Sequence, residues 1–451
     1  MRRDRARLAE TIPGDIMLHW SRLWGCVLVA ACSGRDAPAP VGAEVVTGWN
    51  RLVLELAEGE DHLLTLKGVR TAAMTHLAMH DALQAIAPRY TRYADSGPRV
   101  DADPVAAADL AAYTVMLAQY PDQAERLRQE RDRWMVGAGG APLDTAIALG
   151  QRAAAAVLRA RAGDGWDRKA SYTWHPMAPG VYAEFDEHSR TPKGFVFGAG
   201  WALVTPFMIG TPDRFRPPPP PDIQGAAYAA AFREVKDVGA RHSTTRTADQ
   251  AHLAMWWKEF VEKSHNRLAR ELVAREQLDL WDATRLFALL NMSIFDGYIA
   301  SFDGKYFYTH WRPYTAIRWA SHDGNPETTE DPDWTNLHDH TYAFPSYPSA
   351  HGTVCGAASM VLADVFGAEH PFTLTIRSVD SQGPLSPPVA MDPASRSFDS
   401  FAEAARECAL SRVYLGIHFR YDSEEGLALG RKVGGLGVRE FLRRQGGAVG
   451  P

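Results

Sequence analysis

Apolar residues recur at helical spacing through most of the chain. Residues 70–86 read RTAAMTHLAMHDALQAI, in which Ala, Met and Leu return every three or four positions and neither Gly nor Pro occurs. This spacing is typical of an α-helix. The same character is found in residues 104–119, 143–162, 247–274 and 282–300. Because alternating apolar and polar runs are scarce, few strands are expected, and the sequence predicts an all-α fold.

Two of these segments begin with capping signals. Asp103 stands directly before Pro104, and a proline is well tolerated in the first turn of a helix. Thr247 is followed three residues later by Gln250, the pair of residues that forms a capping box. We therefore expect helices to begin directly after Asp103 and Thr247.

An irregular stretch rich in Gly, Pro and aromatic residues occupies residues 163–223. Five consecutive prolines at positions 217–221 exclude a helix there and favour polyproline II. The large aromatic side chains of this stretch need burial, so we expect an ordered connector rather than a flexible linker. These side chains are Trp174, Tyr182, Phe195, Phe197 and Trp201. The sequence thus predicts two packed helical bundles with long irregular connectors, an N-terminal half at 41–222 and a C-terminal bundle at 223–451.

The first 40 residues have the character of an export leader followed by a linker. From Met17 a short basic stretch ends at Arg22, and an apolar run extends from Leu23 to Ala31. This run is too short to cross a bilayer but suits a signal peptide. It ends in Val-Ala-Ala before Cys32, which resembles the lipobox of bacterial lipoproteins. We expect an exported protein, either periplasmic, anchored to the outer membrane through a lipid on Cys32, or extracellular. The alternative is a cytosolic N-terminus with a chance apolar patch.

Charge and cysteine content exclude several classes of function. The net charge of the 451 residues is −6, so no general basic field attracts nucleic acid or anionic lipid. Any bound anion then requires a local cluster of cations. Cys355 and Cys408 are the cysteines outside the leader. They are too few for a disulfide framework, and a single bridge between them stays open. Oligomeric state is not determined by the sequence.

The first candidate motif is KYFYTHWRP at residues 305–313. Lys305 and Arg312 are seven residues apart, so a helix would place them within about 20° of each other on one face. Two such cations repel each other unless an anion lies between them. The alternative is ordinary surface charge exposed to water.

The second motif is FPSYPSAHGT at residues 344–353, which leads into an apolar segment that suits a helix. Its prolines force a non-helical approach. Ser349 would then lie at a helix N-terminus, where it could be a simple N-cap. The exposed amides and the dipole of such a terminus also bind anions. His351 would stand beside that anion site, where an imidazole can move a proton.

The third motif is SRVYLGIHFRYD at residues 411–422. Arg412 would add a further cation and His418 an imidazole. Asp422 follows His418 by four residues, so a helix would place both on one face, where the carboxylate fixes the tautomer of the imidazole and raises its basicity. The alternative is a histidine–aspartate pair on a helix surface.

Taken in order, these motifs resemble the three-part signature of the vanadium-dependent haloperoxidases and the type 2 phosphatidic acid phosphatases. The resemblance covers roughly residues 246–438. Residues 302–313 and GNPETTEDPDW at 324–334 are similar to the bacterial haloperoxidase branch, and no segment has the 18 or more apolar residues of a membrane helix. A vanadium-chloroperoxidase-like helical fold is implied. One departure is Ala350, where the family usually has Gly; a positive φ there would strain Ala.

The resemblance also implies a role for each motif residue. Cations would neutralise the oxygens of vanadate or phosphate, and they are Lys305, Arg312 and Arg412. Ser349 and the amide of Ala350 would complete this oxyanion pocket. His418 would be the protein ligand of vanadium, or the nucleophile that forms a phosphohistidine. His351 and Asp422 would complete the catalytic set, with His351 as general acid–base.

Several nearby residues have both a functional and a packing interpretation. Phe344 falls where a chloroperoxidase-like member of the family carries Phe, and it could line a halide pocket together with Phe302. His310 and Trp311 could also line such a pocket, or these side chains could simply pack. A further pair, His338 and His340, lies in a polar loop where solvent exposure is more common than a second metal site.

Three hypotheses of function follow. The first is a vanadate-dependent haloperoxidase that uses a halide, hydrogen peroxide and a small organic acceptor. The second is a soluble acid phosphatase that hydrolyses a phosphate monoester through the same residues. The third is a protein that binds phosphate or vanadate without turnover, although pure binding has no need of two histidines. Neither the halide nor the organic acceptor is identified by the sequence.

Overall fold

The structure is a computed structural model that describes residues 42–135, 143–183, 189 and 191–445. The expected leader, with Cys32, lies outside these residues, so export and lipid anchoring stay predictions. The boundary expected at residue 222 also stays a prediction. Among the described helices, none is both long and apolar enough to cross a membrane.

The N-terminal helices pack around α2. Their bounds are α1 (Glu44–Asp61), α2 (Lys67–Ile86), α3 (Pro104–Gln119), α4 (Ala124–Met135) and α5 (Leu143–Ala160), with a 3-10 turn η1 (Pro121–Gln123) before α4. Helix α2 contacts α1, α3 and α5, and also α9 of the C-terminal half. Every residue from Gly68 to Ala85 is buried, which accounts for the apolar character of the whole helix. The expected cap at Asp103 is confirmed, because its carboxylate accepts a hydrogen bond from the amide of Ala106 at 2.8 Å.

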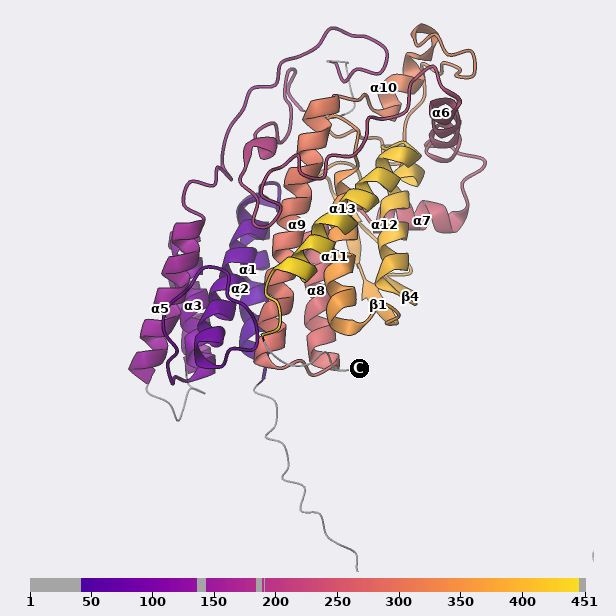
Figure 1. The fold of residues 1–451 in the computed structure, drawn as a ribbon. Coiled ribbons are helices and arrows are strands. Elements are labelled where there is room, and N and C mark those ends of the chain that lie inside the picture. The colour runs from indigo at the N-terminus through magenta and orange to yellow at the C-terminus, as the bar shows by residue number, and fades with distance from the viewer. Residues whose placement is uncertain (1–41, 136–142, 184–188, 190, 446–451) are drawn as a thin grey trace, which may run out of the picture. The chain divides into compact units, whose positions relative to one another are not determined.

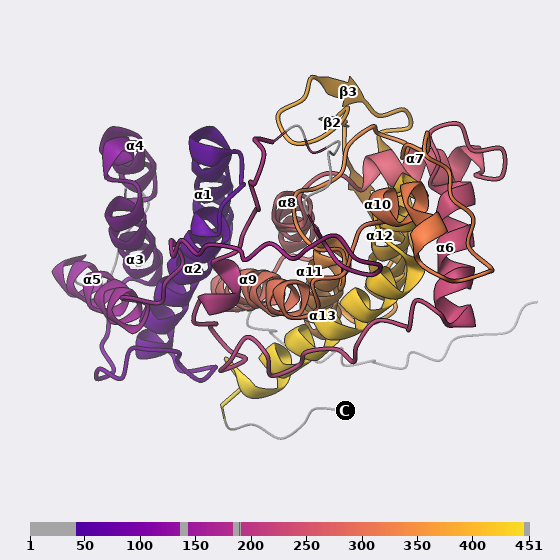
Figure 2. The same ribbon diagram turned by 90° about the horizontal axis from the view of Figure 1, so that it is seen from above.

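The C-terminal helices are grouped around α9 and α11. They are α6 (Ala226–Val238), α7 (Ala248–Trp256), α8 (Val261–Arg275), α9 (Leu280–Tyr308), α10 (Pro313–Arg318), α11 (Ala350–Phe366), α12 (Phe401–Leu415) and α13 (Arg420–Glu440), with a 3-10 turn η3 (Ala320–His322). The helix expected at 247–274 is interrupted after Trp256, so α7 and α8 are separate. The capping box of Thr247 and Gln250 is confirmed. Figures 1 and 2 show α9 between α2 and α11, both of which it contacts.

Few strands are present, as expected, but the expectation of an all-α fold was too strict. Between α11 and α12 the described chain forms two small antiparallel sheets. One pairs β1 (Phe372–Thr375) with β4 (Ser395–Phe398), and the other pairs β2 (Ser378–Asp380) with β3 (Pro388–Ala390). The fold is therefore mainly helical with a minor β element.

The connector between the two halves is ordered where it is described. It contains one short 3-10 turn, η2 (Trp201–Leu203), which contacts α9. The carboxylate of Asp296 on α9 accepts hydrogen bonds from three successive connector amides at 2.6–3.1 Å, those of residues 207–209. Tyr182 is buried and Trp201 half-buried, but Phe195 is 43% exposed, so the burial expected for it was wrong. Backbone hydrogen bonds rather than aromatic burial hold part of this segment.

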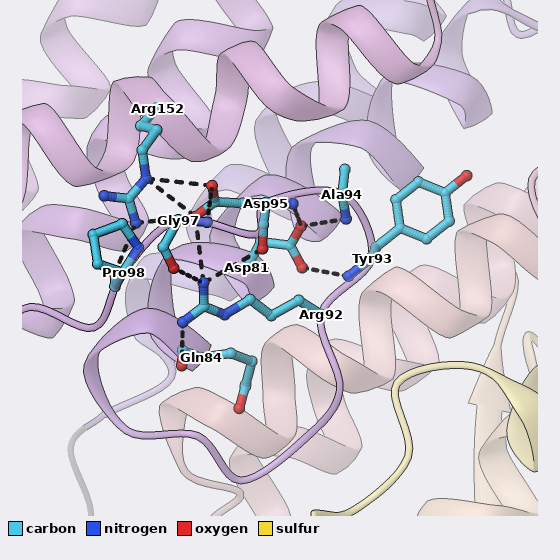
Figure 3. Close-up of polar contacts among 9 residues, drawn as sticks. All are labelled: Asp81, Gln84, Arg92, Tyr93, Ala94, Asp95, Gly97, Pro98 and Arg152. Atoms are coloured by element: carbon cyan, nitrogen blue, oxygen red, sulfur yellow. Dashed lines mark hydrogen bonds and ion pairs between the residues drawn. The ribbon is translucent and has the colours of Figure 1, made fainter.

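A second buried carboxylate organises the loop that follows α2 (Figure 3). Asp81 accepts hydrogen bonds from the amides of Tyr93, Ala94 and Asp95 at 2.7–2.8 Å. Asp95 in turn forms an ion pair of 3.0 Å with Arg152 on α5. The loop is thereby tied to two helices of the N-terminal half.

Glycines allow α11 and α13 to approach each other closely. Gly426, Gly430 and Gly434 follow one another at four-residue spacing on α13. A Cβ on any of them would lie 1.9–2.4 Å from a backbone oxygen of the facing segment 349–357. Real side chains do not fit at such distances, so only glycine permits this contact. The contact brings the first turn of α11 against the first turns of α13.

Candidate active site

Two helix N-termini meet at the candidate site. The amide of Ser349, the N-cap residue of α11, donates to the carbonyl of Asp422 in the first turn of α13 at 2.8 Å. Arg412 approaches from the last turn of α12, and Lys305 from the last turn of α9. Segments more than 100 residues apart in the sequence therefore supply one cluster, as the three motifs predicted.

The three expected cations are buried together. Lys305 is 0% exposed, Arg312 1% and Arg412 3%. Lys305 Nζ donates to the carbonyls of Pro345 and Ser346 at 2.9 and 2.8 Å. These contacts are neutral, and within the described part of the chain no carboxylate forms an ion pair with any of the three cations. Surface charge, the alternative interpretation of these residues, is therefore wrong.

Arg312 and Arg412 also bond mainly to neutral atoms. Arg312 donates through Nε to the carbonyl of Phe344 and through Nη1 to that of Ile417, both at 2.9 Å. Its Nη2 is buried and has no hydrogen-bond partner among the described residues. Arg412 donates from Nε to the hydroxyl of Ser411 at 3.1 Å. Both guanidinium groups can therefore donate further hydrogen bonds.

Burial of these three positive charges costs free energy. Burial lowers the pKa of Arg312 and of Arg412 to about 10. Burial, and then the charge of Arg312, lowers the pKa of Lys305 well below its ordinary value. A buried cation without an anionic partner destabilises the folded state. An oxyanion among the three would relieve that cost.

His418 is held in one tautomer. Its Nδ1 lies 2.9 Å from the carboxylate of Asp422 and 3.2 Å from the hydroxyl of Ser346. Ser346 itself donates to the same carboxylate oxygen. Burial, followed by the charge of Arg312, lowers the pKa of His418 well below its ordinary value. The imidazole is therefore neutral, with its proton on Nδ1 and a lone pair on Nε2.

The Nε2 atom of His418 lies against Arg312, and the charges of Lys305 and Arg412 also lower the pKa of this imidazole. Nε2 lies 3.2 Å from Nη1 of Arg312. Asp422 is fully buried, and burial raises its pKa to about 7, although the hydrogen bond from Ser346 and the charges of Lys305 and Arg312 oppose this rise. Those cations favour the carboxylate form that accepts the proton of Nδ1. The arrangement leaves Nε2 unprotonated, and its lone pair accepts the hydrogen bond from Nη1 of Arg312.

The N-terminus of α11 completes the cluster. Ser349 is an N-cap, as the simpler interpretation held, since its Oγ accepts from the amide of Gly352 at 3.2 Å. A capping hydroxyl still has its own proton to donate. Ala350 is the first residue of the helix and does not have a positive φ, so the strain considered for Ala at this position is absent. His351 Nε2 is buried without a hydrogen-bond partner among the described residues.

A cavity of about 520 Å³ opens beside the cluster. Its inner wall includes Ala350, His351, Arg412 and His418, whereas Lys305, Arg312 and Ser349 do not line it. The rest of the wall is mainly apolar, and its aromatic side chains are Phe195, Phe197, Trp201, Phe260, Tyr298, Phe302, Tyr342 and Phe344. Phe302 and Phe344 therefore both lie at the cavity, and the halide pocket expected there stays a prediction.

Other expected residues lie elsewhere or differ in environment. Trp311 packs in a separate apolar cluster, and His310 hydrogen-bonds to Tyr421 at 2.8 Å. The packing interpretation of both is confirmed. His338 and His340 are 3% and 6% exposed, so the expectation that they are solvated was wrong. No metal-binding group that includes either is found among the described residues.

A disulfide lies one helical turn below the site. Cys355 and Cys408 are bonded to each other. Cys355 follows His351 by four residues on α11, and Cys408 precedes Arg412 by four on α12. The bridge that the sequence left open thus joins the two helices that carry these residues.

Sequence reasoning missed Ser346, Lys258 and Glu262. Ser346 stands inside the second motif and its position there was a usable signal. Lys258 and Glu262 line the cavity from the segment around α8, but nothing in their local sequence distinguishes them from surface residues. Lys258 Nζ donates to the carbonyls of Asp380 and Gln382, which holds the loop between β2 and β3 at the rim.

Comparisons with known proteins agree with one another. The family model described as the VCPO second helical-bundle domain matches residues 285–446. The vanadium chloroperoxidase of Curvularia inaequalis is 28% identical over 251 residues, which cover 44% of this chain and 41% of that protein. The match thus spans about two fifths of the length of this curated relative.

Solved structures extend the likeness of fold over more of the chain. A bacterial vanadium-dependent iodoperoxidase has a TM-score of 0.70 at 22% identity and covers 91% of this chain and 99% of its own. The holo form of a bacterial vanadium-dependent chloroperoxidase has a TM-score of 0.65 at 19% identity, with 89% and 98% covered. At these identities the structures show that the fold is shared.

Proposed function

Because the chain belongs to the vanadium-dependent haloperoxidase family, we propose that it is a vanadate-dependent enzyme that oxidises a halide ion with hydrogen peroxide. The observation that carries this proposal is the set of three buried cations that form no ion pair with a described carboxylate, one of which, Arg312, contacts the unprotonated Nε2 of His418. Such a set needs an anion, and a ring nitrogen with a lone pair is suited to bind an electrophilic centre.

The residues present fit vanadate. The unpartnered Nη2 of Arg312 and Nε2 of His351 are buried polar atoms that a bound oxyanion would satisfy. Lys305, Arg312 and Arg412 would hold its oxygens, together with the hydroxyl of Ser349 and the amide of Ala350, and His418 Nε2 would be the metal ligand. When bound, vanadate supplies a Lewis-acid centre that activates hydrogen peroxide toward a halide without a change of oxidation state.

The cations make the largest contribution to binding in this proposal. Each charge-assisted hydrogen bond to an oxyanion is worth about 1.5–3 kcal/mol, and more where water is excluded. Lys305 and Arg312 are positioned by backbone carbonyls before any ligand arrives. Their geometry therefore requires little reorganisation on binding.

The histidines and Asp422 have separate roles. Asp422 and Ser346 hold the proton of His418 on Nδ1 and thereby keep Nε2 unprotonated. His351 Nε2 has no partner in the described chain, and burial followed by the charge of Arg412 lowers the pKa of this imidazole well below its ordinary value. His351 would accept a proton from incoming hydrogen peroxide at Nε2 and return it to the leaving oxygen, which forms water.

A soluble acid phosphatase remains the second candidate. The same unprotonated Nε2 of His418, supported by Asp422, suits attack on a phosphate monoester. The wall of the adjoining cavity is mainly apolar, however, and suits an apolar molecule better than a charged phosphate ester. We therefore place halide oxidation first.

One assay separates the two functions. Purified protein is tested for halide-dependent oxidation by hydrogen peroxide, with and without orthovanadate, and for hydrolysis of p-nitrophenyl phosphate. We expect halide oxidation that requires vanadate and is lost in His418→Ala. Phosphate release that vanadate inhibits, with no halide oxidation, would establish the phosphatase instead. Oxyanion binding with neither reaction would indicate a binding protein.

A further inference from the structure

The cavity beside the cation cluster is larger than an oxyanion and a halide require. Its volume of about 520 Å³ is in the range of pockets that enclose a small organic molecule. Arg412, His351 and His418 form its inner wall. A molecule in the cavity would therefore lie beside the place where the oxidised halide is formed.

The walls of the cavity are suited to an aromatic ring. Trp201 and Phe302 have ring centroids 4.5 Å apart, and Phe302 and Phe344 5.3 Å. Trp201 belongs to the connector and Phe302 to α9. Gly198 allows the connector to lie so close, because it has a φ of +70° and a Cβ there would lie 2.4 Å from the ring of Phe302. The backbone of the connector is thus shaped to place aromatic surface along the cavity.

One acidic side chain lines the described cavity, and it is Glu262. It is 3% exposed and its Oε2 accepts a hydrogen bond of 2.7 Å from the hydroxyl of Tyr298. An acidic residue in the first turn of a helix commonly just interacts with the helix dipole. Such a residue is normally exposed to water, however, whereas Glu262 is buried and bonds to another helix. Burial raises its pKa to about 7, so it can exchange a proton near neutrality.

We propose that this cavity binds a phenolic acceptor, with the ring against the aromatic wall and the phenolic hydroxyl donating to Glu262. The inference rests on the proposed function, because the hypohalous acid produced there is the co-reactant. Arg412 and Lys258 disfavour an organic cation, and the mainly apolar lining disfavours a purely polar acceptor. A phenol can pack its ring against the wall and donate a hydrogen bond from its hydroxyl to the carboxyl group.

The reaction in the cavity balances as phenol plus hypohalous acid to halophenol plus water. A ring carbon forms a bond to the halogen, and the halogen–oxygen bond breaks with its electron pair on oxygen. The ring is oxidised by two electrons and the halogen is reduced. The phenolic proton passes to Glu262 as the bond forms, the ring proton is lost to the leaving oxygen, which becomes water, and Glu262 returns its proton to the phenol oxygen.

Binding is measured without vanadate, peroxide or halide, so that failure of this inference differs from failure of the proposed function. Calorimetry on the whole protein compares 4-methylphenol with 4-methylanisole, which has the same ring but no hydroxyl proton. We expect 4-methylphenol to bind at least fivefold more tightly. Glu262→Met should reduce this ratio to about one, and Glu262→Gln should retain part of it because an amide oxygen still accepts.

Glu58→Met is the matched control, since Glu58 is exposed and lies outside this cavity, and it should keep the wild-type ratio. Thermal unfolding of each variant checks that it folds. Equal binding of the two ligands by the wild-type protein would overturn the inference, as would a preference that survives in Glu262→Met. If phenol binds as expected but no halide is oxidised, the proposed function fails and the site remains.

Discussion

Asp81 in the N-terminal half and Arg312 in the C-terminal half are both withdrawn from water, but their surroundings differ. Both oxygens of Asp81 accept backbone hydrogen bonds, and its neighbour Asp95 is paired with Arg152. Arg312 retains an unpartnered Nη2, and no carboxylate pairs with it in the described chain. A buried charge whose contacts are complete serves the fold. A buried cluster with an excess of positive charge and an unpartnered donor indicates a ligand.

The two regions also gain rigidity by different means. Hydrogen bonds from backbone amides to the carboxylates of Asp81 and Asp296 fix a loop and the connector. The C-terminal site depends on the glycine contact between α11 and α13 and on the disulfide between α11 and α12. Like charges in the site would push its helices apart, so covalent and steric constraints are the more suitable means there.

The largest loss of stability is expected on removal of Asp81, the carboxylate whose two oxygens both accept hydrogen bonds. Asp81→Ala leaves three buried or half-buried amides without an acceptor, so we expect the free energy of unfolding to fall by about 3–5 kcal/mol. Urea unfolding measures it. Asp101→Ala, an exposed residue of the same loop, should change stability by less than about 0.5 kcal/mol. Equal effects in the two variants would show that Asp81 does not hold the loop.

Removal of the disulfide should lower the free energy of unfolding by nearly as much. The double variant Cys355→Ala with Cys408→Ala is expected to lose about 2–4 kcal/mol, because the bridge spans 53 residues of sequence. It should also lower kcat, since His351 and Arg412 lie one turn from the bridge. Unfolding and halide oxidation are measured on the same preparation. Full activity in the double variant would mean that the bridge does not position these residues.

Removal of a cation should have the opposite effect on stability. In Arg412→Met an uncompensated buried charge is replaced by an apolar side chain, so we expect the ligand-free protein to gain about 1–3 kcal/mol. Turnover should nevertheless fall at least a hundredfold. Arg406→Met is the control, because Arg406 is an exposed residue of the same helix. If Arg412→Met destabilised the ligand-free protein, the cation cluster would serve the fold, as Asp81 does in the N-terminal half.

Asp109 provides a smaller, pH-dependent test within the N-terminal half. It accepts from Trp49 at 2.8 Å, its other oxygen has no partner among the described residues, and burial raises its pKa to about 8. The folded state therefore holds a proton that the unfolded state releases above about pH 4. This contribution to stability is present at low pH and is lost as pH rises toward 8.

The variant Asp109→Asn should remove that part of the pH dependence. The stability difference between wild type and variant is expected to change by at least about 1 kcal/mol between pH 4 and pH 8, to the disadvantage of the wild type. Chemical unfolding at several pH values measures it. A difference that stays constant with pH would contradict a raised pKa for Asp109.

Local patterns predicted much of the fold and the core of the site. Helical spacing, Asp103 and the Thr247 capping box marked helices that the structure contains. The cation motif and the histidine–aspartate motif identified residues that do lie together. These predictions succeeded because each depends on residues close in sequence, or on motifs whose order resembles that of a known family.

The failures have a common physical origin in long-range contacts. Glu262 meets Tyr298 across 36 residues, and the connector reaches Phe302 from about 100 residues away. The burial of His338 and His340 likewise depends on packing by segments distant in sequence, which no local pattern records. The four short strands lie between α11 and α12, where alternation over three or four residues is too brief to recognise.

The most direct test of the central claim is the binding of orthovanadate to the purified protein. Calorimetry and thermal unfolding are measured together, because a ligand that binds only the folded state raises its melting temperature. We predict one vanadate bound per chain, with a rise in melting temperature that grows with concentration in the wild type and in Arg406→Met and is absent in Arg412→Met. Absence of binding in the wild type, or an equal rise in Arg412→Met, would contradict an oxyanion site at this cluster.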